Sequence, residues 1–363
     1  MQLFVGKISA LTNPVTYIII NVATIVLLYS GAIRVNEGTI TQGQVVALVN
    51  YMSQILIELV KLANLIITIT KALACANRIE NVLELQSSMQ WEQNVPGESR
   101  AERTEIYAGA DDGTGETDAD NPYVVEFDHV HLAYAGAGAE SLSDIDFKVK
   151  RGQTIGIIGG TGSGKSSLVN MIPRFYDASA GSVKVDGRDV RSYAMEELRQ
   201  KVGIVLQKAV LFQGTIRDNL RWGNKDATEE ELWQAVESAQ AREFVEQKSG
   251  KLDAQIAQEG RNLSGGQKQR LTIARALVGK PEILILDDSA SALDYATDAA
   301  LRKAIREMEG DMTVFIVSQR ASSIQYADRI IVLDDGEMVG IGTHDQLLAD
   351  CKVYQEIYYS QIG

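Results

Sequence analysis

The eight residues from Gly159 to Ser166 constrain the fold of this 363-residue chain more than any other feature. They have the sequence Gly-Gly-Thr-Gly-Ser-Gly-Lys-Ser and lie between a short β-branched run, Thr154 to Ile158, and an apolar-periodic segment, Ser167 to Ile172. A strand, a glycine loop and a helix in this order form a phosphate-binding loop, whose main-chain N–H groups converge on a nucleotide's phosphates. We therefore predict an α/β P-loop nucleotide-binding domain that binds ATP. The predicted ATP-binding residues of the loop are Gly159, Gly160, Thr161, Gly162, Ser163, Gly164, Lys165, Ser166 and Ser167.

A second apolar run ends in two carboxylates. Four consecutive apolar residues, Ile283 to Leu286, are followed by Asp287 and Asp288. Open α/β sheets bind their ligands at the carboxyl ends of the strands. We predict that Lys165 reaches the β- and γ-phosphates, and that the hydroxyl of Ser166 binds Mg²⁺. Asp287 is predicted to hold the same Mg²⁺, with Asp288 next to the γ-phosphate. The alternative is a turn-forming pair of aspartates.

The amino-terminal quarter is predicted to lie in a membrane. No residue from Ile8 to Ile33 carries a charge, and its central part is long and apolar enough for a bilayer, which needs about 20 such residues. A secretory signal peptide is the competing interpretation, because the run follows Lys7. A second span, Gly43 to Leu73, has apolar residues at three- and four-residue steps with polar residues between them. Those polar residues indicate a helix that faces a wetter interior, or one that only packs on other helices.

Two spans return the chain to its starting side of the membrane. Lys61, Lys71 and Arg78 lie toward the end of the second span, which indicates an exit into the cytoplasm. We predict a multi-pass protein of the cell membrane, in contact with membrane lipid, whose nucleotide-binding domain is cytoplasmic. The predicted domains are a partial transmembrane domain at 1–85, a flexible acidic linker at 86–121 and the nucleotide-binding domain at 122–363.

Charge and cysteine usage exclude other classes. The formal net charge is −13, and the stretch from Glu92 to Asp120, with nine acidic residues and two arginines, supplies seven of those charges. An acidic chain of this kind is not expected to bind nucleic acid, which requires clustered Lys and Arg. The two cysteines, Cys75 and Cys351, are far apart and indicate neither a metal site nor a disulfide framework.

The segment Leu263-Ser264-Gly265-Gly266-Gln267 opens a predicted helix, Lys268 to Leu277. With this LSGGQ segment the chain resembles the ATP-binding cassette (ABC) transporters, and the resemblance covers essentially the whole chain. It implies that two cassettes dimerise head to tail, with each ATP between one subunit's phosphate loop and the other's LSGGQ. The amino-terminal segment is similar to the last two helices of a six-helix exporter half, with the first four absent. The residues implied to serve the partner's nucleotide are Ser264, Gly265, Gly266, Gln267 and Asp294.

The resemblance assigns further roles within the chain's own site. Tyr134 matches the aromatic residue that stacks on adenine, although a packed strand tyrosine would have the same identity. Gln207 matches the family's glutamine loop, which touches Mg²⁺ and the membrane domain together. These assignments make ATP and Mg²⁺ the expected ligands.

Two residues depart from the family's active members. Asp288 occupies the position of the catalytic Glu and is one methylene shorter, and a misplacement of about 1 Å can cost on the order of a hundredfold in rate. Gln319, after the predicted strand Thr313 to Val317, occupies the position of the switch histidine and cannot carry charge or shuttle a proton. Together they predict slow hydrolysis at this chain's own site and a heterodimer with a subunit that supplies Glu and His. A homodimer with two slow sites is the rival.

We therefore predict the ATP-binding subunit of an exporter, an ATPase when in complex, for small amphipathic molecules, lipids or peptides. One alternative is a non-catalytic ATP-binding module whose nucleotide holds a complex together. Another is a soluble cassette protein of the DNA-repair or translation kind, which would need no uncharged run like Ile8 to Ile33.

Overall fold

A computed structural model describes residues 2–84, 89, 121–308 and 310–362. The chain divides into two compact units, Met1–Ser88 and Met89–Gly363. The predicted acidic linker at 86–121 lies almost wholly outside the described residues.

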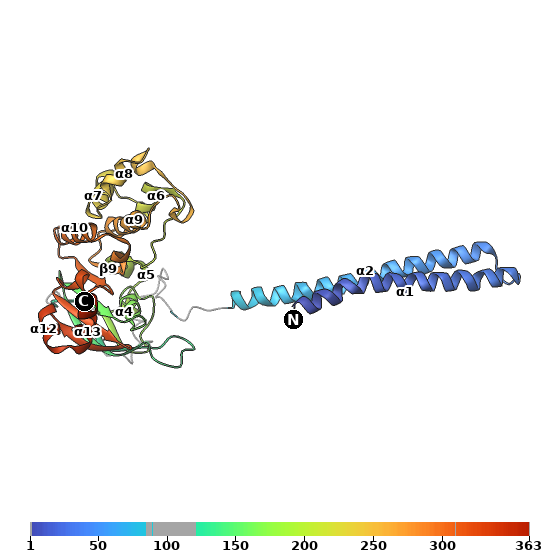
Figure 1. The fold of residues 1–363 in the computed structure, drawn as a ribbon, viewed down its shortest axis with the longest axis horizontal. Coiled ribbons are helices and arrows are strands. Elements are labelled where there is room, and N and C mark those ends of the chain that lie inside the picture. The colour runs from blue at the N-terminus through green and yellow to red at the C-terminus, as the bar shows by residue number, and fades with distance from the viewer. Residues whose placement is uncertain (1, 85–88, 90–120, 309, 363) are drawn as a thin grey trace, which may run out of the picture. The chain divides into compact units, whose positions relative to one another are not determined.

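The first unit is a pair of long helices, α1 (Gln2–Asn36) and α2 (Gln42–Leu83) (Figure 1). Thr41 and Gln44 form a capping box that starts α2, with the Thr41 amide donating to Gln44 Oε1 at 2.8 Å. The two helices meet closely at Gly31, where a Cβ would lie 2.8 Å from a Val45 methyl group. Only a glycine allows this approach, and Val45 is buried by it.

Both helices are long and apolar enough to cross a membrane: an 18-residue window has mean hydropathy 2.0 within Tyr17–Asn36 and 1.7 within Gln42–Leu83. Most of their large apolar side chains from Tyr17 onward are exposed. The second helix continues to Leu83, beyond the predicted end of the span at Leu73. No Gly or Pro occurs between these two positions to end it.

The second unit is built on a six-stranded sheet with the strand order β12-β11-β3-β10-β9-β6. The five strands from β11 to β6 are parallel, and β12 pairs antiparallel at one edge. The phosphate-loop strand and its two neighbours are therefore central. Their bounds are β3 Thr154–Gly159, β6 Val202–Val205, β9 Ile283–Asp287, β10 Thr313–Val317, β11 Arg329–Asp334 and β12 Glu337–Gly342.

The unit also contains a separate four-stranded antiparallel sheet with the strand order β2-β1-β4-β5. Its strands are β1 Tyr123–Leu132, β2 Leu142–Lys150, β4 Ala180–Val185 and β5 Arg188–Asp189. A two-stranded ribbon joins β7 (Gly214–Thr215) to β8 (Gln255–Ile256).

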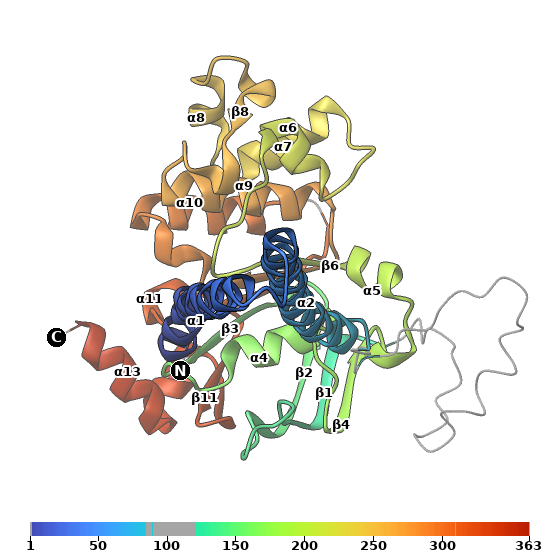
Figure 2. The same ribbon diagram turned by 90° about the vertical axis from the view of Figure 1, so that its right-hand side faces the viewer.

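Ten α-helices of this unit are described. They are α4 Lys165–Met171, α5 Met195–Lys201, α6 Ile216–Arg221, α7 Glu229–Ser238, α8 Arg242–Glu246, α9 Gly265–Val278, α10 Tyr295–Arg306, α11 Ala321–Ile324, α12 His344–Asp350 and α13 Lys352–Ile362. Short 3-10 helices are η1 Val190–Ser192, η2 Lys251–Asp253, η3 Gln258–Gly260 and η4 Ser289–Ala292. Figure 2 shows α6, α7, α8 and α9 gathered at one end of the unit and β1, β2 and β4 at the other.

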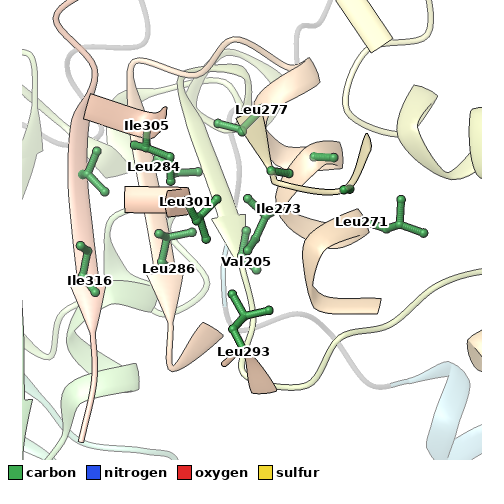
Figure 3. Close-up of a cluster of buried hydrophobic side chains, with 14 of the residues drawn as sticks. Val205, Leu271, Ile273, Leu277, Leu284, Leu286, Leu293, Leu301, Ile305 and Ile316 are labelled. Atoms are coloured by element: carbon green, nitrogen blue, oxygen red, sulfur yellow. The ribbon is translucent and has the colours of Figure 1, made fainter. Parts of the chain in front are cut away.

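The central sheet separates two apolar cores. Alternate residues of β9 and β10 point to opposite faces, so Leu284 and Ile316 join one core while Ile285 and Phe315 join the other. The first core lies against α7, α9 and α10 (Figure 3). The second lies against α4 and the antiparallel sheet. Burial on both faces explains why these strands are continuous apolar runs, the pattern that made them predictable.

Candidate nucleotide-binding site

A cleft of about 420 Å³ opens at the carboxyl ends of the central strands. The loop after β3, the residues after β9 and β10, and the turn between β11 and β12 all contribute to it. Because parallel strands end at the same edge, residues from position 134 to position 336 meet here. The predicted site residues that line the cleft are Tyr134, Thr161, Gly162, Gly164, Lys165, Ser166, Ser167, Gln207, Asp287, Asp288 and Gln319.

The loop conformation requires its glycines. Gly162 and Gly164 have φ angles of 87° and 91°, in the left-handed region that other residues rarely adopt. Gly159 also has no room for a side chain, because a Cβ there would lie 2.1 Å from the carbonyl oxygen of Leu333. Gly159, Gly160 and Ser163 are not among the lining residues; Gly159 and Ser163 are buried, whereas Gly160 is exposed.

Lys165 lies within the curve of the loop. Its Nζ donates to the carbonyl oxygen of Gly159 at 2.9 Å, to that of Gly160, and to Ser163 Oγ at 3.3 Å. Burial lowers the pKa of Lys165, while Asp287 and Asp288 act in the opposite direction. A bound polyphosphate would further favour the charged ammonium.

A hydroxyl and a carboxylate meet in the lining of the cleft. Ser166 Oγ donates to Asp287 Oδ1 at 3.1 Å, although the two residues are 121 positions apart. Burial raises the pKa of Asp287; the Ser166 hydrogen bond lowers it and the neighbouring Asp288 raises it further. Oxygen donors in a polyphosphate cleft suit Mg²⁺, which keeps several waters and needs only one or two protein ligands. The residues present therefore fit this ion.

Asp288 has an unusual backbone. Its φ is 46°, its amide donates to the carbonyl oxygen of Val317 at 3.0 Å, and its Oδ2 accepts from Gln207 Nε2 at 3.2 Å. The residue is thus attached to both the end of β10 and the loop after β6. Gln319 follows β10 by two residues and lines the same cleft.

Tyr134 also lines the cleft. Its hydroxyl lies 2.7 Å from Ser167 Oγ in the first turn of α4, and its ring meets Tyr176 edge to face at 4.9 Å between centroids. The ring is half-buried and packed at the mouth of the site.

The LSGGQ segment does not reach this cleft. Ser264 caps α9 in a capping box with Gln267, and the Gln267 amide donates to Ser264 Oγ at 3.3 Å. Asp294 caps α10 by accepting from the amide of Thr297 at 2.9 Å and from its hydroxyl at 2.8 Å. Ser264, Gly265 and Asp294 are exposed, and a Cβ on Gly265 would meet nothing within 4 Å. The structure therefore does not bring these residues together with the chain's own phosphate loop.

Sequence reasoning missed part of the lining. Glu140 and Ser141 come from the β1–β2 connection, Ser318 follows β10, and Asp335 and Gly336 form the β11–β12 turn. The Asp335-Gly336 pair is a local turn signal. Its place beside the loop depends on the pairing of β11 with β3, which no local pattern specifies.

Comparisons with known proteins agree with this geometry. Residues 142–291 match the family model described as ABC transporter. An ABC transporter ATP-binding protein of Mycobacterium tuberculosis is 39% identical over 98% of the chain and 58% of its own length. A fatty acid ABC transporter ATP-binding/permease protein of the same species is 33% identical over 96% of the chain and 52% of its own length. This chain therefore spans somewhat more than half the length of these relatives.

Among solved structures, a bacterial Atm1-family ABC exporter with ATP bound matches with a TM-score of 0.69 and 28% identity. The match covers all of this chain and 60% of that one. The chain therefore contains an ATPase domain of the ABC transporter family. Its relatives are ATP-binding/permease proteins and exporters.

Proposed function

We propose that the chain is the ATP-binding subunit of a membrane exporter, which couples ATP binding and hydrolysis to the outward movement of a substrate. One observation supports the proposal most strongly. The chain has both a cleft lined by the phosphate loop and an exposed LSGGQ segment, but the two lie on separate surfaces. A second subunit placed head to tail would bring its own LSGGQ to this cleft. Ser264, Gly265, Gly266, Gln267 and Asp294 would then serve the partner's ATP.

Within the chain's own site, the roles follow from position. The amides of Gly159 to Ser166 surround the phosphates, and Lys165 binds the β- and γ-phosphates. Ser166, Asp287 and Gln207 hold Mg²⁺, which neutralises the phosphate oxygens when bound. Tyr134 stacks on adenine, and Asp288 and Gln319 face the γ-phosphate.

Asp288 and Gln319 make hydrolysis at this site slow. Hydrolysis needs a carboxylate that orients the attacking water, and the Asp288 carboxylate is short and engaged with Gln207. The complete LSGGQ segment indicates that the partner's site is the active one. We therefore favour a heterodimer whose other subunit carries Glu and His, over a homodimer with two slow sites.

The amino-terminal helices support a membrane location. We place α1 and α2 in the bilayer as the transmembrane part at 1–85, followed by an acidic linker at 86–121 and a cytoplasmic ATP-binding domain at 122–363. The cargo class that fits such an exporter is a small amphipathic molecule, a lipid or a peptide.

Replacement of Lys165 tests the proposal. Lys165→Ala in the full chain removes a charged phosphate ligand, so ATP affinity should fall by roughly ten- to a hundredfold, measured by competition with a fluorescent ATP analogue. Lys303→Ala is the matched control, because Lys303 is an exposed helical lysine remote from the cleft lining. Equal ATP affinity in the two variants would overturn the proposal.

A second candidate is a non-catalytic ATP-binding module. Asp288 and Gln319 favour this second candidate, because they stand where the family's active members carry the catalytic Glu and the switch His. The rate of ATP hydrolysis by the complex with its partner distinguishes the two candidates. An exporter hydrolyses ATP, and its rate falls when Ser264 or Gly265 is changed. A non-catalytic module shows no hydrolysis and no such change.

A further inference from the structure

The carboxyl-terminal helix α13 reaches the loop that carries Gln319. Gln361 in its last turn uses both ends of its side-chain amide there. Its Nε2 donates to the carbonyl oxygen of Gln319 at 2.7 Å, and its Oε1 accepts from the amide of Ala321 at 2.9 Å. One side chain thus holds the main chain on both sides of Arg320.

The loop needs such an external partner. The short helix α11 begins at Ala321, and its N-cap residue Arg320 provides no capping side-chain bond. The first amides of a helix have no partner within the helix, and Gln361 supplies the acceptor for Ala321. Ser318 Oγ accepts from the Arg320 amide at 2.9 Å, so the main chain between Gln319 and Ala321 is also held from within the loop.

The helix that carries Gln361 is firmly anchored. Tyr354 is fully buried in the first core, and its hydroxyl lies 2.8 Å from His344 Nδ1 of α12. Gln361 lies seven residues later and so on the same face of the helix. The position of the Gln319 main chain is therefore tied to the packing of α13.

We infer that Gln361 is a positioning residue for the nucleotide site, which fixes the loop so that the Gln319 side chain faces the γ-phosphate. The inference rests on the proposed function, in which Gln319 contacts that phosphate. ADP lacks this group, so Gln361 supports the preference for ATP over ADP rather than nucleotide binding in general. The carboxyl-terminal helix thereby takes part in nucleotide discrimination without touching the nucleotide.

The test compares ATP and ADP affinities of the full chain by competition with a fluorescent ATP analogue. Gln361→Ala should lower the ATP-to-ADP affinity ratio by roughly three- to tenfold and leave ADP affinity unchanged. Gln361→Glu, which keeps the acceptor but loses the donor to Gln319, should act in the same direction and guards against a folding failure of the alanine variant. Gln355→Ala is the matched control, because Gln355 lies in the same helix but bonds to the carbonyl oxygens of Leu348 and Ala349.

A double-mutant cycle with Gln319→Ala separates positioning from general stabilisation. If Gln361 acts through Gln319, the double variant shows the same affinity ratio as Gln319→Ala alone. Additive effects, an equal loss of ATP and ADP affinity, or the same ratio change in Gln355→Ala would overturn the inference. Failure of the proposed function is distinguishable, since it appears as unchanged ATP affinity in Lys165→Ala.

Discussion

At the scale of single residues, the backbone conformation and the hydrogen bond of Asp288 could not be predicted from the sequence. The identity of the residue predicted a carboxylate one methylene shorter than Glu. The structure adds a left-handed backbone, φ 46°, and a hydrogen bond from Gln207. Asp is tolerated in this region better than longer side chains, because its short polar side chain bonds locally. No pattern in the sequence indicates that φ angle, which accompanies a hydrogen bond from the Asp288 amide to the carbonyl oxygen of Val317 at the end of β10.

Restoration of the two departing side chains should raise turnover at this site. Asp288→Glu together with Gln319→His, in the complex with the partner's phosphate loop disabled, is expected to increase ATP hydrolysis by about tenfold or more, because a longer carboxylate and an ionisable ring return. Phosphate release under single-site conditions measures the change.

Asp335→Glu is the control for this experiment. Asp335 also lines the cleft and has a φ of 45°, so it matches Asp288 in backbone and in the added methylene. A rate that stays at the parent level in the double variant would show that another feature limits hydrolysis.

At the scale of elements, α9 has two roles that can be separated. Its N-cap Ser264 stabilises the helix within the chain and, in the proposed dimer, faces the partner's ATP. The helix at 268–277 and the phosphate-loop helix were predicted from local patterns, although α9 starts earlier than predicted, at Gly265, with Ser264 as its cap. The strand Thr313–Val317 and the buried run of β9 follow from residue chemistry alone. The positions of the β1–β2 connection and the β11–β12 turn beside the loop do not, because long-range strand pairing sets them.

Removal of this cap should cost both stability and function. Ser264→Ala is expected to lower the free energy of unfolding by about 0.5–2 kcal/mol, to leave ATP affinity at the chain's own cleft unchanged, and to slow turnover at the partner's site. Thermal unfolding, nucleotide competition and phosphate release provide the three readouts.

Thr343→Ala provides the comparison, since Thr343 forms the same capping box on α12 with Gln346. It should show the stability loss without the loss of turnover. If both variants slow turnover equally, Ser264 acts only through helix stability.

At the scale of the whole molecule, the sequence separates an apolar helical part from an α/β part by composition alone. Each unit has its own packing: a close helix contact at Gly31 in the first, and two cores on one sheet in the second. The assembly that the proposed function needs lies beyond either unit, because in that proposal another subunit completes the ATP site. The boundaries of the proposed linker remain a prediction.

A charge in the middle of α1 tests the membrane assignment. Val26 is exposed and lies at the centre of the Tyr17–Asn36 segment, so Val26→Arg should disfavour insertion by about 2.5–3.5 kcal/mol. The fraction of full chain that stays with membranes after alkaline washing should fall. Val339→Arg adds the same charge to an exposed position of edge strand β12 and should leave that fraction unchanged. Equal retention of both variants would argue against a spanning α1.

The length of α2 has a mechanical consequence. Its 42 residues correspond to about 63 Å of helix, twice the roughly 30 Å of a bilayer's hydrocarbon. If the proposed membrane span holds about half of α2 in lipid, the other half would extend beyond the hydrocarbon as a stiff helix. A tilt of only about 10° would swing the free end of that half sideways by about 5 Å. A small change in the tilt of α2 would thus move its free end by more than the distance over which side chains make contact.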